Sequence, residues 1–238
     1  MSHKQLLITP ESLSPYVRAR AGGKGANLHT MTKAGLLVPE WFVLPTTAFD
    51  NFIKTRGLET FLADALKKDF KEAEKIIEAK FLEVKMPEDL ADLIISNWES
   101  RLDRSMISVR SSAADEDGSS HSFAGQLSSY LYLDDADSII SSVIKCWASA
   151  FSERGLSYRA QNKISNQGIK VAVVLQQMID PELSGVMFTQ DPTKPARAAI
   201  MINAVYGVGE GLVGGHLDPD SWTISPEGEV IEENIVEK

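Results

Sequence analysis

The sequence has little of what several protein classes require. Its 238 residues include one cysteine, Cys146, so an internal disulfide is excluded and a reducing compartment, the cytoplasm, is expected. No apolar run approaches the roughly 18 residues of a membrane-spanning helix, and the first ten residues do not have the pattern of a signal peptide. Positive charge is also scarce, because 24 Lys and Arg face 33 Asp and Glu, for a net charge of −9. We therefore expect no nucleic-acid or membrane partner, although a few clustered cations can still bind an anionic nucleotide.

The rest of the composition predicts a globular α+β protein with two differently built parts. Hydrophobic residues make up 43% and charged residues 24% of the chain, which is ordinary for a globular protein. Up to residue 167, apolar positions recur mostly at helical spacing. From residue 168 onward, β-branched runs alternate with Gly- and Pro-containing turns. The sequence therefore predicts a mostly helical N-terminal part, residues 1–167, and a strand-rich C-terminal part, residues 168–238.

The spacing of apolar residues and turn signals places the individual elements. Helices are expected near 26–34, 46–53, 58–82 and 87–98, and from 138 with an interruption near Gly155. Extended segments are expected near 6–8, 38–45, 106–109, 130–133, 170–175, 185–189, 199–204, 222–224 and 230–236. Residues 170–175 are continuously apolar after Lys170, which is typical of a strand buried on both faces.

A glycine-rich stretch at residues 21–28, AGGKGANL, is a candidate anion site. Three glycines before a helical pattern predict a turn that opens a helix, where free N–H groups and the positive end of the helix dipole converge. Lys24 would add a mobile cation. The spacing is not that of a P-loop, so the P-loop mechanism does not apply. The alternative is a flexible turn with a solvated lysine.

A second candidate lies in residues 105–130, SMISVRSSAADEDGSSHSFAGQLSSY. A short strand presents Arg110 before a loop that contains Gly125. A guanidinium can hold two phosphate oxygens, and glycine lets backbone N–H groups approach them. The alternative is an arginine that only pairs with a nearby carboxylate. Acidic residues 115–117 are either magnesium ligands or a solvated loop.

The strand at 170–175 runs into Gln176-Gln177-Met178, which offers polar groups beside an apolar slot. Such a segment could form hydrogen bonds with the edge of an adenine base. A second glycine-rich loop, residues 206–215, contains Glu210. It is not a dinucleotide-binding fingerprint, because no long helix is expected after it.

These segments together resemble the N-terminal nucleotide-binding region of the phosphoenolpyruvate synthase family, which includes the rifampicin phosphotransferases and, more distantly, pyruvate phosphate dikinase. The resemblance covers nearly the whole chain. It rests on seven segments in the same order: 22–28 (GGKGANL), 109–113 (VRSSA), 122–126 (SFAGQ), 146–149 (CWAS), 176–178 (QQM), 184–189 (SGVMFT) and 207–210 (GVGE).

The resemblance implies an ATP-grasp-like fold in which two subdomains close over a nucleotide cleft. It implies an ATP-dependent phosphotransferase that moves a phosphoryl group from ATP to a histidine on a separate swivelling domain, and then to pyruvate or another acceptor. The site residues it implies are Lys24 and Arg110 on the phosphates, Gly125 and Ser129 over the triphosphate, Gln176, Gln177 and Met178 at the adenine, and Glu210 as a ribose or polar contact.

The chain also departs from the family pattern. Ala114 and Asp115 precede Glu116-Asp117, where the family commonly has an Ala-Thr-Ala-Glu-Asp run, and Ser129 stands where threonine is expected. The segment that holds Mg2+ in the family, the phosphohistidine domain and the acceptor domain are expected beyond Lys238. None of the four histidines lies in a histidine-domain motif. We therefore expect these 238 residues to be inactive alone; the alternative is a stand-alone nucleotide-binding or regulatory module without phosphotransfer.

Overall fold

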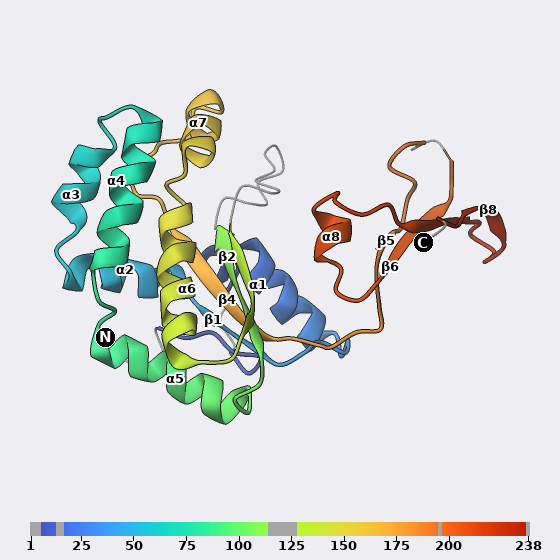
Figure 1. Ribbon diagram of the computed structural model, residues 1–238, viewed down its shortest axis with the longest axis horizontal. Coiled ribbons are helices and arrows are strands. Elements are labelled where there is room, and N and C mark those ends of the chain that lie inside the picture. Colours follow the sequence, from blue (N-terminus) through green and yellow to red (C-terminus); the bar gives the residue numbers. More distant parts are fainter. Residues whose placement is uncertain (1–5, 13–16, 114–127, 195–196, 237–238) are drawn as a thin grey trace. The chain divides into compact units, whose positions relative to one another are not determined.

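The computed structural model describes residues 6–12, 17–113, 128–194 and 197–236. It is a mixed α/β protein with two antiparallel sheets (Figure 1). The chain divides into two compact units, Met1–Met178 and Ile179–Lys238. In the part of the chain described, no helix is both long and apolar enough to cross a membrane.

The sheet of the first unit has the strand order β1-β4-β2-β3. Its strands are β1 (Trp41–Leu44), β2 (Ile107–Ala113), β3 (Ser129–Leu133) and β4 (Val171–Gln177). Strand β4 is buried from residue 171 to 176, as its apolar run predicts. The change of composition near residue 168 predicts that β4 belongs with the C-terminal strands. It belongs instead to the first sheet, because it pairs with β1 on one side and β2 on the other.

Helices cover both faces of this sheet (Figure 1). On one face, α1 (Val17–Lys33) packs against Trp41, Val43, Ala172 and Val174 in a small core. On the other face, the alternate residues of β2 and β4 join a larger core with the remaining helices of the unit. These helices are α2 (Thr46–Thr55), α3 (Glu59–Ala65), α4 (Phe70–Glu83), α5 (Glu88–Arg101), α6 (Ala136–Ser149) and α7 (Glu153–Gln161).

Two expected helices are divided differently from the prediction, and side-chain caps explain why. The periodic run 58–82 is split into α3 and α4, because Asp69 accepts a hydrogen bond from the Lys71 N–H and begins a new helix. The break after α6 falls at residues 150–152, not at Gly155. Ser152 caps α7 by accepting from the Gly155 N–H at 3.2 Å.

The second unit is built on a sheet with the order β5-β6-β7-β8. Its elements are β5 (Leu183–Phe188), β6 (Ile200–Tyr206), the short helix α8 (Glu210–Val213), β7 (Asp220–Ile224) and β8 (Val230–Asn234). The predicted turn after β5 is held by Asp191, which is 2% exposed and accepts from the Thr193 N–H at 2.8 Å and the Lys194 N–H at 3.1 Å.

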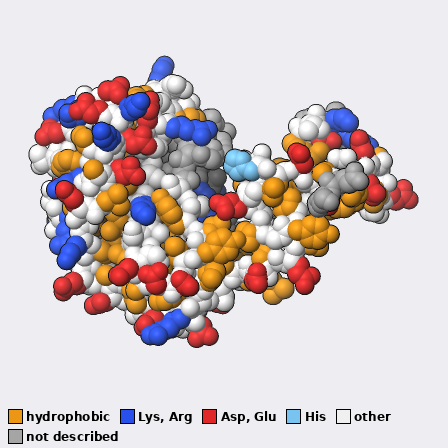
Figure 2. Space-filling view, viewed as in Figure 1, with side chains coloured by type: hydrophobic (Ala, Val, Ile, Leu, Met, Phe, Trp, Pro, Cys, Tyr) orange, Lys and Arg blue, Asp and Glu red, His pale blue; other side chains and the backbone are white. Residues whose placement is uncertain are grey.

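The charges of the first unit are mixed on its surface. Figure 2 shows acidic and basic side chains interspersed over its helices on the visible face. Some form close ion pairs, such as Lys67 with Asp64 and Lys80 with Glu83, whose side chains are between 40% and 74% exposed. Exposed pairs of this kind contribute little to stability.

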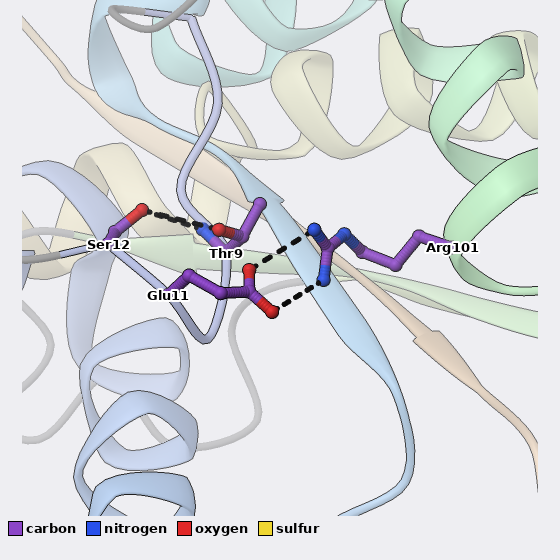
Figure 3. Close-up of polar contacts among 4 residues, drawn as sticks. All are labelled: Thr9, Glu11, Ser12 and Arg101. Carbon is purple, nitrogen blue, oxygen red and sulfur yellow. Dashed lines mark hydrogen bonds and ion pairs between the residues drawn. The ribbon is translucent and has the colours of Figure 1, made fainter.

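One ion pair fastens the N-terminal segment to α5 (Figure 3). The two guanidinium nitrogens of Arg101 contact the two carboxylate oxygens of Glu11, each at 3.1 Å. Burial acts to raise the pKa of Glu11, but hydrogen bonds with Thr9 and Arg101 outweigh it, so the pKa lies below its usual value of 4.5.

We expect Glu11→Gln to destabilise the protein at neutral pH by less than about 1 kcal/mol, since the carboxylate is 68% exposed and screened by solvent. A carboxylate whose pKa is lowered by folding stabilises the protein at pH values above its unfolded-state pKa. This stabilisation is lost as the pH falls through the folded-state pKa. The difference between wild type and variant in free energy of unfolding should therefore shrink between pH 7 and pH 3. Denaturant titrations at several pH values measure it, and a difference that is constant with pH would contradict the assignment.

Candidate functional site

The glycine-rich stretch lies within α1, where Gly22 interrupts the helix with φ 66° and ψ 178°. A Cβ at Gly22 would lie 2.3 Å from the main-chain oxygen of Ser112, so only glycine allows this approach. Ser112 also donates its hydroxyl to the Ala21 carbonyl at 2.9 Å and accepts from the Gly25 N–H at 3.4 Å. These contacts fix the glycine-rich stretch, called the glycine loop below, against Ser112 near the end of β2.

This geometry agrees with one expectation and adds to it. Gly22 has non-helical dihedral angles and separates two helical segments that are combined in α1, so a helix follows the glycine turn as predicted. Residues 17–21, which were not expected to be helical, form the first segment. The close approach of Gly22 to Ser112, which excludes a side chain at position 22, is not revealed by the local sequence. Lys24 lies two residues after the kink, beside Gly25, which packs against Ser112 and Val43.

Arg110 lies on β2, two residues before Ser112, and therefore on the same face of the sheet, because side chains alternate along a strand. Val109 belongs to the core on the opposite face. The residues paired with Arg110 are Val174 on β4, which packs against α1, and Ser129 on β3. Arg110 is half-buried and Ser129 is exposed. The α1 face thus presents a cation and a hydroxyl on neighbouring strands.

Gln176 lies on this face too, near the other end of the strands. It is paired with Ser108 and Trp41, is 9% exposed, and donates its side-chain amide to the Pro39 carbonyl at 3.3 Å. The N–H of Gln177 bonds to the Glu40 carbonyl and that of Met178 to the Met106 carbonyl, both at 2.9 Å. Contacts of these two residues' main chain with a ligand would therefore use carbonyl oxygens, which suit the amino group of adenine.

The predicted phosphate and adenine residues on the first sheet, Arg110 and Gln176, lie at different positions along its strands. Arg110 is two residues from Ser108, the partner of Gln176, so the two positions are roughly 7 Å apart along the strand. The structure brings Arg110, Ser129 and Gln176 to the face on which the Lys24 segment packs. Glu210 begins α8 in the second unit. Gly125 and the acidic residues 115–117 lie outside the described residues.

The charge of Lys24 also affects the thiol of Cys146 on α6. Burial raises the pKa of the Cys146 thiol to about 12, although a hydrogen bond with the Ser111 main chain and the Lys24 ammonium both act to lower it. The thiol contacts the carbonyl oxygens of Val109 and Ser128, each at 3.7 Å. Cys146 is therefore a neutral, buried group at neutral pH, as its apolar surroundings in the sequence predict.

Two features of the site were missed from the sequence. Ser112 holds the glycine-rich stretch in place by donating its hydroxyl to the Ala21 carbonyl, and Ser108 donates its hydroxyl to the Gln176 carbonyl at 3.4 Å. Ser108 and Ser112 are each two residues from Arg110, so the alternation of side chains along a strand would have placed both on the face of Arg110. In the described ranges, no three His, Cys, Asp or Glu side chains are grouped closely enough to hold a metal ion.

Comparison with known proteins gives one family over most of the chain. Residues 18–238 match the family model described as "Pyruvate phosphate dikinase, AMP/ATP-binding domain". The chain is 35% identical over 231 residues to the "Probable phosphoenolpyruvate synthase" of Methanothermobacter thermautotrophicus, a match that covers 92% of this chain and 34% of that protein. It is also 35% identical over 228 residues to the "Rifampicin phosphotransferase" of Streptomyces sviceus, covering 92% of this chain and 26% of that protein.

A third match is the "Probable phosphoenolpyruvate synthase" of Methanocaldococcus jannaschii, which is 36% identical over 235 residues and is covered over 19% of its length. The chain therefore spans about a third or less of each of these relatives. The expected resemblance to phosphoenolpyruvate synthases and rifampicin phosphotransferases is confirmed. This chain belongs to the pyruvate phosphate dikinase AMP/ATP-binding domain family.

Proposed function

We propose that these residues bind ATP for a phosphotransferase like phosphoenolpyruvate synthase, which passes a phosphoryl group to a histidine on a separate swivelling domain and then to an acceptor. The observation that carries the proposal is the contact between the glycine loop and Ser112. It fixes the segment bearing Lys24 against the strand that bears Arg110, two residues away and on the same face.

Lys24 and Arg110 hold the phosphates in this proposal, and Ser129 and Gly125 lie over the triphosphate. Phosphoryl transfer needs positioning and neutralisation of the charge on the transferring group more than covalent chemistry from the protein. Two cations on separate, well-packed elements supply both. Arg110 is suited to a bidentate contact with phosphate oxygens, whereas Lys24 acts as a more mobile point charge.

The base would lie at the Gln176–Met178 end of the first sheet, and Glu210 of the second unit would contact the ribose or another polar group. We propose that the two units correspond to the two subdomains of an ATP-grasp-like fold, divided after Met178. Magnesium would accompany the nucleotide with ligands from outside the described residues.

The final acceptor would be chosen outside these 238 residues. The relatives' names include both a synthase of phosphoenolpyruvate and a phosphotransferase of rifampicin, so pyruvate and an antibiotic hydroxyl are both acceptors of the appropriate kind. In the proposal, the histidine and acceptor domains are separate from this chain, which would bind ATP but turn over no acceptor by itself.

The test is calorimetric titration of the 238-residue protein with Mg·ATP and with a non-hydrolysable analogue. We expect saturable binding of both, and Lys24→Ala should weaken it by roughly tenfold, since one charge-assisted contact is lost. Circular dichroism confirms that each protein is folded. A folded wild type that binds neither ligand, alone or in a longer protein that continues past Lys238, would overturn the proposal.

A further inference from the structure

Strand β3 contains an irregularity at the Gln176 end of the first sheet. Ile107 pairs with Leu133 and Val109 pairs with Tyr130, so two residues of β3, Leu131 and Tyr132, lie opposite the single residue between Ile107 and Val109. This is the two-against-one count of a β-bulge. Bulges turn side chains away from the regular pleat and are common next to active sites.

The bulge places Tyr132 on the α1 face. The flanking Tyr130 and Leu133 both pack against the larger core, on the opposite face. The two residues between them therefore lie on the face that also carries Arg110 and Gln176. Tyr132 is 53% exposed, a large aromatic side chain left open to solvent on this face.

Tyr132 is also strained and is held next to the proposed base-binding segment. Its φ is 60°, a left-handed conformation that is rare for a bulky side chain in a strand. Its N–H donates to the sulfur of Met178 at 3.0 Å. Strained residues of this kind persist where the surrounding structure holds them, and they are concentrated at binding sites.

We propose that the ring of Tyr132 is a stacking surface for the purine base of the nucleotide, an inference that rests on the proposed function. Aromatic rings stack on bases without requiring hydrogen bonds, because every base presents a flat π face. Hydrogen-bonding groups of Gln176 and of the main chain after it would then select the base, while Tyr132 supplies affinity. The strain at Tyr132 is retained because it presents the ring at this position.

The proposal predicts that stability and binding change in opposite directions in one variant. Tyr132→Gly removes the left-handed strain, so its Tm should rise above that of wild type. The same variant loses the ring, so Mg·ATP should bind roughly tenfold more weakly in calorimetry, the effect of one stacking contact. Inorganic tripolyphosphate, which has no base, should bind as it does to wild type.

Two controls accompany this variant. Tyr132→Phe keeps the ring and should keep ATP affinity. Lys163→Gly relieves the same kind of strain, since Lys163 has a φ of 58° and follows α7, away from the proposed base. It should raise the Tm without changing the Kd for ATP.

The role of Tyr132 would be overturned if Tyr132→Gly bound ATP as wild type does, or if its affinities for ATP and tripolyphosphate fell by the same factor. Either result would leave the proposed function standing. A folded wild type that binds neither ligand would overturn both. The two failures are thus distinguished in one set of titrations.

Discussion

Gly22→Ala is expected to destabilise the protein by roughly 3 kcal/mol, the largest effect of any single methyl group that we predict. The new Cβ would lie 2.3 Å from the Ser112 oxygen and 2.4 Å from its Oγ, and the residue would have to adopt a φ of 66°. A steric clash with main chain is not relieved by a rotamer change, so either the kink in α1 or the end of β2 must move. Urea denaturation followed by circular dichroism measures the loss.

Gly35→Ala is the matched control, because Gly35 has a φ of 78° but nothing lies within 4 Å of its Cβ position. It carries the left-handed strain without the clash, and should cost about 1 kcal/mol. Equal losses at the two positions would show that Ser112 gives way easily. The glycine loop would then not be held as rigidly on β2 as the site requires.

Arg110→Ala is expected to weaken Mg·ATP binding by roughly tenfold to a hundredfold and to leave adenosine binding unchanged. Removing the guanidinium eliminates charge-assisted hydrogen bonds to phosphate, which adenosine does not have. Calorimetry with both ligands gives the comparison. Arg110→Lys should recover only part of the affinity, because an ammonium lacks the planar fork that holds two oxygens.

Lys67→Ala is the control for the change in net charge. Lys67 is 74% exposed and pairs with Asp64 on the neighbouring turn, and the variant removes one positive charge without touching the sheet. It should bind ATP as wild type does at physiological salt. If Arg110→Ala weakened adenosine and ATP by the same factor, its role would be structural, and the phosphates would have to be held elsewhere.

Much of the local structure follows from the sequence because its causes are local. The apolar run at 170–175 requires a strand covered on both faces, and β4 is one. The helix that starts after Pro87 and the short turn that starts at Asp191 are each explained by their own first residues. Lys24 and Arg110 stand out as candidates because a cation beside glycine or after an apolar strand pattern has a recognisable chemistry. The strand itself extends further than predicted, so Arg110 lies in the middle of β2 and not at its end.

The tertiary structure decided what depends on contacts between distant segments. Glycine is required at position 22, between the two helical segments of α1, because Ser112, ninety positions away, occupies the space that a side chain would need. Strand β4 joins the first unit because β1 and β2 both pair with it, although the strands that follow it in sequence lie in another sheet. The bulge at Tyr132 arises from the register between β2 and β3, which the alternation of β3 alone does not specify. The sequence by itself thus determined which residue types were available for a nucleotide site, and the pairing of strands decided which of them share a face.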